Sequence, residues 1–157
     1  MPRRKLRTRA SRSPRRGAEQ TGKATVLSPQ AQNAQMTQGL AVVGVYRPQG
    51  EYSLVGAVEL IRSALEHCRR KSVPRLLING MGLTGVPIPS LIDRFLMAEE
   101  WAHEADGMVA MALAVHPEYI HPQKFGVQVA AHFGMKLDVF SSEADGFAWI
   151  SNLADSK

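Results

Sequence analysis

The sequence predicts an α/β fold, with a mostly parallel sheet of four to five strands and helices that alternate with the strands. Two observations carry this prediction. Short apolar runs, typical of strands covered on both faces, alternate along the chain with longer amphipathic segments that are typical of helices. Alternation of this kind indicates parallel strands joined by right-handed helical crossovers, in the order βαβαβαβα.

Residues 1–35 are rich in Arg, Ser, Gln and Pro and hold almost no apolar side chains before residue 26. Such a segment cannot bury enough apolar surface to offset the entropy of ordering, so it is predicted to be a disordered basic N-terminal extension. We interpret it as dispensable, with Met36 as a candidate start. An arm for nucleic acid or anionic lipid and an organelle transit peptide are the alternatives. Residues 36–157 are then expected to form a single α/β domain.

The basic character of the chain is confined to its first residues. Residues 1–23 carry nine Lys or Arg and one Glu, whereas residues 24–157 carry ten Lys or Arg and thirteen Asp or Glu. A mildly acidic domain does not indicate a nucleic-acid groove. The longest apolar run, residues 108–115, is far too short for a transmembrane segment. The single cysteine, Cys68, excludes an internal disulfide and fits a cytoplasmic location.

The first predicted strand spans residues 40–46 and is followed by a turn at residues 47–50. The next segment, closed by the basic residues 69–71, is a predicted helix, because apolar residues recur in it at steps of three and four. Cys68 belongs to that apolar face and is interpreted as a small core residue rather than a reactive thiol. The predicted inner face of this helix is formed by Leu54, Val58, Ile61, Leu65 and Cys68.

Residues 75–90 are the segment around which the whole prediction is organised. Residues 76–78 are a short apolar run that indicates a buried strand, and two prolines stiffen the loop that follows it. Ser90 and Asp93 form a variant of the capping box, so a second helix is predicted at residues 91–105. This loop is the first place where we expect a functional site. Its candidate ligand-binding or partner-binding residues are Asn79, Gly80, Gly82, Thr84, Gly85, Pro87, Pro89 and Ser90.

Gly80, Gly82 and Gly85 match the dinucleotide-binding pattern G-x-G-x-x-G directly after a predicted strand. In such sites the helix begins within the glycines, which the two following prolines disfavour here. Glu118, beyond the next strand, also lies too far along the chain to be the ribose-binding acid. We therefore interpret these glycines as a flexible loop that needs positive φ, and no cofactor is predicted.

The second half of the chain continues the alternation. Residues 108–115 are predicted to form the most buried strand because all eight are apolar. A third helix is predicted from about residue 122 to residue 133, with proline in its first position. A strand at residues 137–140 follows, and the last helix is capped by a serine, 141 or 142. The predicted inner face of the last helix is Phe147 and Ile150, with Trp149 as a further candidate, and that of the second helix is Leu91, Phe95, Ala98, Ala102 and Ala105.

His116, Glu118 and His121 follow the strand at residues 108–115. Their spacing matches no standard metal-binding pattern, and two prolines interrupt the segment, so no metal is predicted. Because the carboxyl ends of parallel strands lie at one edge of a sheet, the loop after residue 79 and the loop after residue 115 are expected to face one crevice. The candidate crevice residues are His116, Tyr119, His121 and Trp101, the last interpreted mainly as a core or boundary residue.

Several short sequence segments are similar to segments of a known family. They are residues 75–79, the loop to Ser90, residues 124–127, residues 130–134, and residues 139–140 followed by 148–150. Because of these segments, the chain from about residue 39 to residue 153 resembles the STAS/SpoIIAA-like family of small bacterial domains. The resemblance implies a non-enzymatic regulatory or protein-interaction domain. Sister groups include anti-sigma-factor antagonists and transporter-linked domains, and the fold is often compared with that of lipid-carrying Sec14-type domains.

The antagonists that the chain resembles carry an Asp-Ser pair, with the serine phosphorylated, just before the helix that follows the second core strand. In this sequence Pro89-Ser90 occupies that place, and the aspartate is absent. Ser90 is therefore interpreted first as a helix cap and second as a candidate phosphoacceptor. A phosphate there would lie at the positive end of the helix.

Three functions are compatible with these patterns. The first is a protein-interaction or regulatory module that uses the loop and the second helix, and the partner would be a protein. The second is a binder of small apolar or lipid-like ligands. An enzyme is least favoured, because no nucleophile with a base, no paired carboxylates and no metal set stand out. An oligomer is compatible with all three. The predicted ligand pocket is lined by Met81, Leu83, Phe95, Trp101 and Met111.

Overall fold

The computed structural model describes residues 42–154. Their main sheet has four strands in the order β1-β3-β5-β6, and every pairing in it is parallel. The predicted α/β fold with a mostly parallel sheet is therefore confirmed. The predicted extension at residues 1–35 and the first two residues of the predicted strand at 40–46 lie outside the described residues. The strands are β1 (Val43–Tyr46), β3 (Arg75–Asn79), β5 (Ala110–Ala114) and β6 (Leu137–Phe140).

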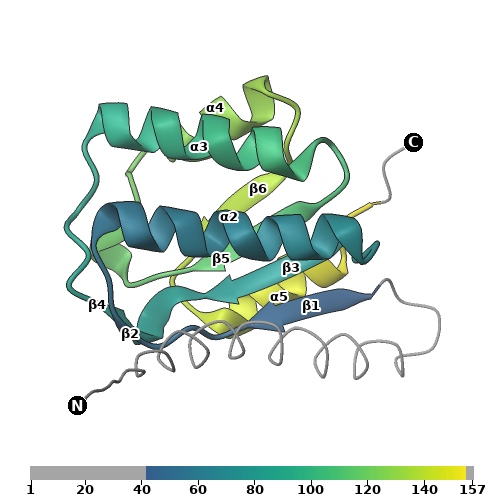
Figure 1. Cartoon of the computed structure of the whole chain (residues 1–157), viewed down its shortest axis with the longest axis horizontal. Helices are drawn as coiled ribbons and strands as arrows, with labels where there is room; N and C mark the ends of the chain where they lie inside the picture. Colours follow the sequence, from purple (N-terminus) through teal and green to yellow (C-terminus); the bar gives the residue numbers. More distant parts are fainter. Residues whose placement is uncertain (1–41, 155–157) are drawn as a thin grey trace, which may run out of the picture.

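Helices α2 (Leu54–Arg70), α3 (Leu91–Ala105) and α4 (Phe125–His132) lie on one face of the sheet, and α5 (Glu143–Ser151) lies on the other (Figure 1). The strand order explains this arrangement. Each strand is added on the same side of the previous one, so right-handed crossovers place all three connecting helices on the same face. Helix α5 follows the last strand and is free to cover the opposite face.

The buried strand β3 shows how the two faces are built. Leu76 and Ile78 belong to the large cluster under α2 and α3, whereas Leu77, between them, packs with Ile150 of α5 on the other face. Alternate side chains of a strand point to opposite faces, so a strand covered on both sides is apolar throughout. Strand β3 pairs with β1 on one side and β5 on the other, which confirms the central place predicted for this segment.

The helix ends follow local signals in the sequence. Ser90 caps α3, since its Oγ accepts a hydrogen bond from the Asp93 amide at 3.1 Å while the Asp93 carboxylate accepts one from the Ser90 amide at 3.0 Å. The other end of α3 closes at Asp106 and Gly107, both with positive φ. The predicted bounds of this helix are therefore confirmed. Ser142, one of the two predicted caps, begins α5.

An ion-pair cluster joins α2 to α3. Arg62 and Arg69 of α2 both donate to the carboxylate of Glu104 on α3, at 2.9 and 2.7 Å. Partial burial would raise the pKa of Glu104, but the hydrogen bonds from Arg69 and Arg62 outweigh it, and the pKa lies below its ordinary value. Beneath this cluster, complete burial raises the pKa of the Cys68 thiol to about 12, as expected for a core cysteine.

The predicted inner face of α3 is correct in its second half and wrong in its first. Ala98, Ala102 and Ala105 are buried, but Leu91 and Phe95 are 53% and 39% exposed. Leu91 and Ala98 lie seven residues apart and therefore on nearly the same side of the helix. The difference comes from what lies beneath them, because the first turns of α3 extend past the carboxyl ends of the strands (Figure 1).

Two further predictions are corrected by the structure, and one pairing of strands was not predicted. Helix α4 begins at Phe125 rather than near residue 122, because Lys124 adopts a left-handed conformation with φ of 51° that no α-helix continues through. Phe147 was predicted to face inward but is 43% exposed, and Gly146 contacts the sheet in its place. The sequence also gave no signal for a two-residue parallel pairing of β2 (Gly50–Glu51) with β4 (Leu83–Thr84).

Candidate functional site

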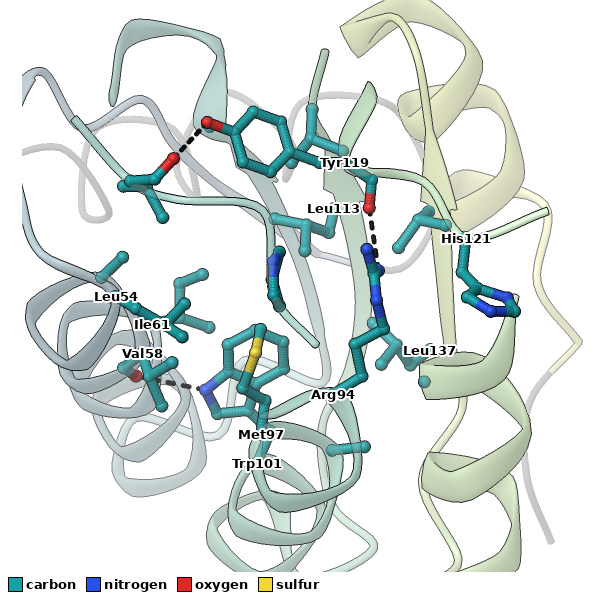
Figure 2. A pocket seen from close by; sticks show the side chains of 18 of the residues that line it. Leu54, Val58, Ile61, Arg94, Met97, Trp101, Leu113, Tyr119, His121 and Leu137 are labelled. Atoms are coloured by element: carbon teal, nitrogen blue, oxygen red, sulfur yellow. Dashed lines mark hydrogen bonds between the residues drawn. The ribbon is translucent and has the colours of Figure 1, made fainter. Parts of the chain in front are cut away.

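An apolar pocket with a cavity volume of about 130 Å³ lies between the helix layer and the sheet (Figure 2). It lies beside the carboxyl ends of the strands, where ligands bind in open α/β sheets. Its volume is close to the roughly 150 Å³ of a cavity known to take up a benzene-sized molecule. The strands contribute Leu113 of β5 and Leu137 and Val139 of β6 to its lining.

One wall of the pocket is built by α2 and α3. Trp101 of α3 is only 3% exposed, and its indole N–H donates to the backbone carbonyl of Val58 on α2 at 3.1 Å. This hydrogen bond fixes the ring while one part of it lines the cavity (Figure 2). Trp101 is therefore both a core residue and part of the pocket wall. Its neighbours in this wall are Leu54, Ala57, Val58, Ile61, Met97 and Ala98.

The mouth of the pocket is closed by two loops that come from different strands. The hydroxyl of Tyr119, in the loop after β5, donates to the backbone carbonyl of Val86, in the loop after β3 (Figure 2). The ring of His116 reaches across in the same way, with Nε2 at 3.2 Å from the carbonyl oxygen of Met81. The structure thus brings together the two loops that the sequence predicts to face one crevice, through direct contacts between them.

The titratable side chains of the described pocket lining are basic or phenolic. Among the described residues, its titratable lining side chains are Arg94, His116, Tyr119, His121 and Lys124, and none of them is a carboxylic acid. Lys124 is matched by Asp138, whose carboxylate lies 2.7 Å from its ammonium group. Within residues 42–154 Arg94 has no such match, because its guanidinium contacts there only the backbone carbonyl oxygen of Tyr119, at 2.9 Å.

Arg94 occupies an unusual place in its helix. It lies in the first turn of α3, where the positive end of the helix disfavours a cation by about 0.3–1 kcal/mol. Its side chain crosses the pocket from α3 toward Tyr119 instead of turning into solvent (Figure 2). The sequence interpretation missed this residue. The signal that could have identified it is a basic side chain in the first turn of a helix, where acidic side chains are favoured.

Six of the twelve residues named as candidates from the sequence line the pocket. Asn79 does not face the cavity; its side-chain amide donates to Glu143 at 2.7 Å, and its carbonyl oxygen accepts from the Met81 amide. Arg47 holds the same carboxylate with two hydrogen bonds, and together with Asn79 it lowers the pKa of Glu143. The candidates that line the pocket are Gly80, Pro89, Trp101, His116, Tyr119 and His121, and Leu83 of the predicted pocket wall lines it as well.

Gly82 and Gly85, the two later glycines of the loop, are each required for a different structural reason. A Cβ on Gly82 would lie 2.9 Å from the carbonyl oxygen of Pro48, so only glycine fits there. Gly85 alone among the three has positive φ, at 80°. The interpretation of all three as residues that need positive φ is therefore wrong for Gly80 and Gly82, which lie in a short 3-10 turn. Thr84 belongs to β4, and Pro87 is exposed.

Ser90 and three predicted wall residues also lie away from the cavity. The Ser90 hydroxyl is engaged in the cap of α3, so its role as a phosphoacceptor stays a prediction. Met81 is not among the lining residues, and Met111 is completely buried in the core. Phe95 lies on the outside of α3, where its ring packs edge-on against Phe133 with centroids 6.0 Å apart.

Comparison of the chain with protein-family models, with curated proteins and with solved structures finds no significant match. In residues 42–154, no helix has the length and apolar character needed to cross a membrane. Within the same range, no three His, Cys, Asp or Glu side chains are grouped so as to hold a metal ion. Evidence about function therefore comes from the pocket and from the surface of the molecule.

Proposed function

We propose that this chain is a binding protein for a small apolar molecule, which enters the pocket between the helix layer and the carboxyl ends of the strands. The observation that carries the proposal is the cavity itself. Its wall residues are mostly aliphatic or aromatic, and its polar groups are few. Pockets of this kind are typical of sites for small molecules.

The pocket also has walls that are held in place before any ligand arrives. Trp101 is fixed by its hydrogen bond to Val58, and the two loops at the mouth are joined through Tyr119 and Val86. A site that is already ordered loses little conformational entropy on binding, so more of the apolar contact is expressed as affinity. The ordered walls support the interpretation that the pocket binds a ligand, rather than that it results from loose packing.

Filling the cavity tests the proposal. We expect Val127→Phe, which places a ring in the pocket from α4, to weaken binding of hexan-1-ol by about tenfold or more, since the ring occupies the space of the ligand. Binding is measured by the fluorescence of Trp101 in a Trp149→Phe background, where it is the only tryptophan.

The matched control is the same change at Val55, which is 78% exposed on α2 and does not line the pocket. Val55→Phe is expected to leave binding unchanged. Equal affinity of both variants for hexan-1-ol would place the ligand elsewhere, and no saturable response of the parent chain would refute the proposed function. Thermal unfolding of each variant establishes that it is folded.

A second candidate function is a regulatory or protein-interaction domain of the STAS/SpoIIAA-like type, acting through the outer surface of α3. The observation that favours it is a set of apolar side chains exposed on and just before this helix. Exposed apolar residues gathered on one helix are typical of a surface that contacts another molecule. The residues are Ile88, Leu91, Ile92, Phe95 and Leu96.

A charge placed in this surface tests the second candidate. Ile92→Glu is expected to abolish recovery of a protein partner on the immobilised chain, because a carboxylate in an apolar contact is left without a partner. Val55→Glu is the control, since Val55 and Ile92 are 78% and 71% exposed on different helices. Recovery of the same partner by both variants would contradict a contact through α3.

A further inference from the structure

We infer that the ligand of this pocket is an amphiphile with a single carboxylate, whose apolar part fills the cavity while the carboxylate binds the guanidinium of Arg94. The inference rests on the proposed function and adds the chemical class of the ligand. It depends on three features of the described residues: a pocket lining without acidic groups, a charge on Arg94 that no described carboxylate matches, and the position of that charge beside apolar walls.

The first feature is the sign of the charge at the mouth. The described lining residues include an arginine, a lysine and two histidines but no aspartate or glutamate. A pocket of this composition disfavours cationic ligands and favours anionic ones. A purely apolar ligand would need none of these groups, and each of them costs free energy to desolvate when a ligand covers the mouth.

The second feature is the contrast between the two permanent cations. Lys124 is matched by Asp138 at 2.7 Å, and its ammonium group also donates to the backbone carbonyl of Val139 at 3.2 Å. In the part of the chain that the structure describes, Arg94 contacts a neutral carbonyl, that of Tyr119, through one nitrogen only. A guanidinium has five N–H donors, so most of its capacity is available to a ligand. One unmatched positive charge fits one negative charge.

The third feature is the geometry of Arg94. The bond to Tyr119 holds the guanidinium at a fixed point of the pocket, and Leu113 and Leu137 lie near it among the apolar lining residues (Figure 2). The planar fork of a guanidinium binds both oxygens of a carboxylate at once. Such a bond is stronger beside apolar walls than in open water. A ligand bound here is therefore oriented, with its head at Arg94 and its chain in the cavity.

The dimensions of the cavity set the size of the apolar part. A volume of about 130 Å³ accommodates a body of roughly six carbon atoms, by comparison with the benzene-sized occupant of a similar cavity. Hexanoate is therefore the probe, and hexan-1-ol is its neutral counterpart with the same chain. Hexyl phosphate serves as the probe for a different anionic head.

Binding of the three probes to the full chain, read from Trp101 fluorescence in the Trp149→Phe background, tests the inference. Hexanoate is expected to bind about tenfold or more tightly than hexan-1-ol, as a charge-assisted bond to a fixed guanidinium implies. Arg94→Met is expected to abolish this preference while the affinity for hexan-1-ol changes by less than about threefold. Arg94→Lys, which keeps the charge but not the fork, is expected to restore part of it.

The other outcomes are decisive as well. If hexanoate and hexan-1-ol bind equally, or if Arg94→Met weakens both to the same extent, Arg94 is only a tether for the Tyr119 loop, and the inference is overturned while the proposed function stands. If hexyl phosphate binds more tightly than hexanoate, the carboxylate is the wrong head group. If none of the three binds, the proposed function fails. Unfolding curves of both Arg94 variants show whether each is folded.

Discussion

Replacing Trp101 with alanine is expected to lower the free energy of unfolding by about 3–5 kcal/mol. The ring is 3% exposed, belongs to the main core and joins α3 to α2 through its hydrogen bond to Val58. Its removal adds a void to a pocket that is already present, and the surrounding helices cannot collapse into both. A loss of this size is a large part of the stability of a typical domain, about 5–15 kcal/mol.

Two other variants show which part of the effect comes from packing. Trp101→Phe keeps most of the apolar ring and removes the donor, so we expect a loss of about 1–2 kcal/mol. Trp149→Ala is the matched control, because Trp149 is only partly buried and lies on the opposite face of the sheet. Urea denaturation gives the free energies. If Trp101→Ala and Trp149→Ala lowered the free energy of unfolding equally, Trp101 would not be the more important core residue.

The second large effect is expected on the other face of the sheet. Ile150 of α5 is completely buried against Leu77, and α5 is the only described helix that packs on this face. Ile150→Ala is therefore expected to lower the free energy of unfolding by about 2–5 kcal/mol. The close fit of Gly146, where a Cβ would lie 3.0 Å from Leu77, leaves little room for α5 to shift and fill the void.

Phe147 provides the internal control for this prediction. It lies on the same helix but is 43% exposed, so Phe147→Ala is expected to cost less than Ile150→Ala, although the phenylalanine is the larger residue. Thermal or urea unfolding of the two variants measures the difference. A greater loss for Phe147→Ala would show that α5 packs with the face that the sequence alone predicted.

The segment at residues 76–90 shows what local signals predict well. The apolar run of β3, the prolines of the loop and the Ser90–Asp93 cap each act over a few residues, and the structure has the strand, the loop and the start of α3 where they indicate. Part of the site follows from the same reasoning, because parallel strands deliver the loops after β3 and β5 to one edge of the sheet.

Other features depended on contacts between distant segments. The close approach of Gly82 to Pro48, the pairing of β2 with β4 and the bond of Asn79 to Glu143 each join parts of the chain that no local pattern connects. Of the eight predicted loop residues, only Gly80 and Pro89 line the pocket. Arg94 was missed because its direction is decided by the carbonyl of Tyr119, 25 residues further along the chain.

The sequence by itself determined the α/β class, the order of the elements and the ends of α3, since periodicity, caps and prolines act through the nearest residues. Only the tertiary structure decided which apolar side chains are covered. Leu91 and Ala98 share one side of α3, yet one is exposed and the other buried, because the helix extends past the strands beneath it. Arg94, in the same part of α3 as Leu91, lines the pocket beside the carboxyl ends of the strands.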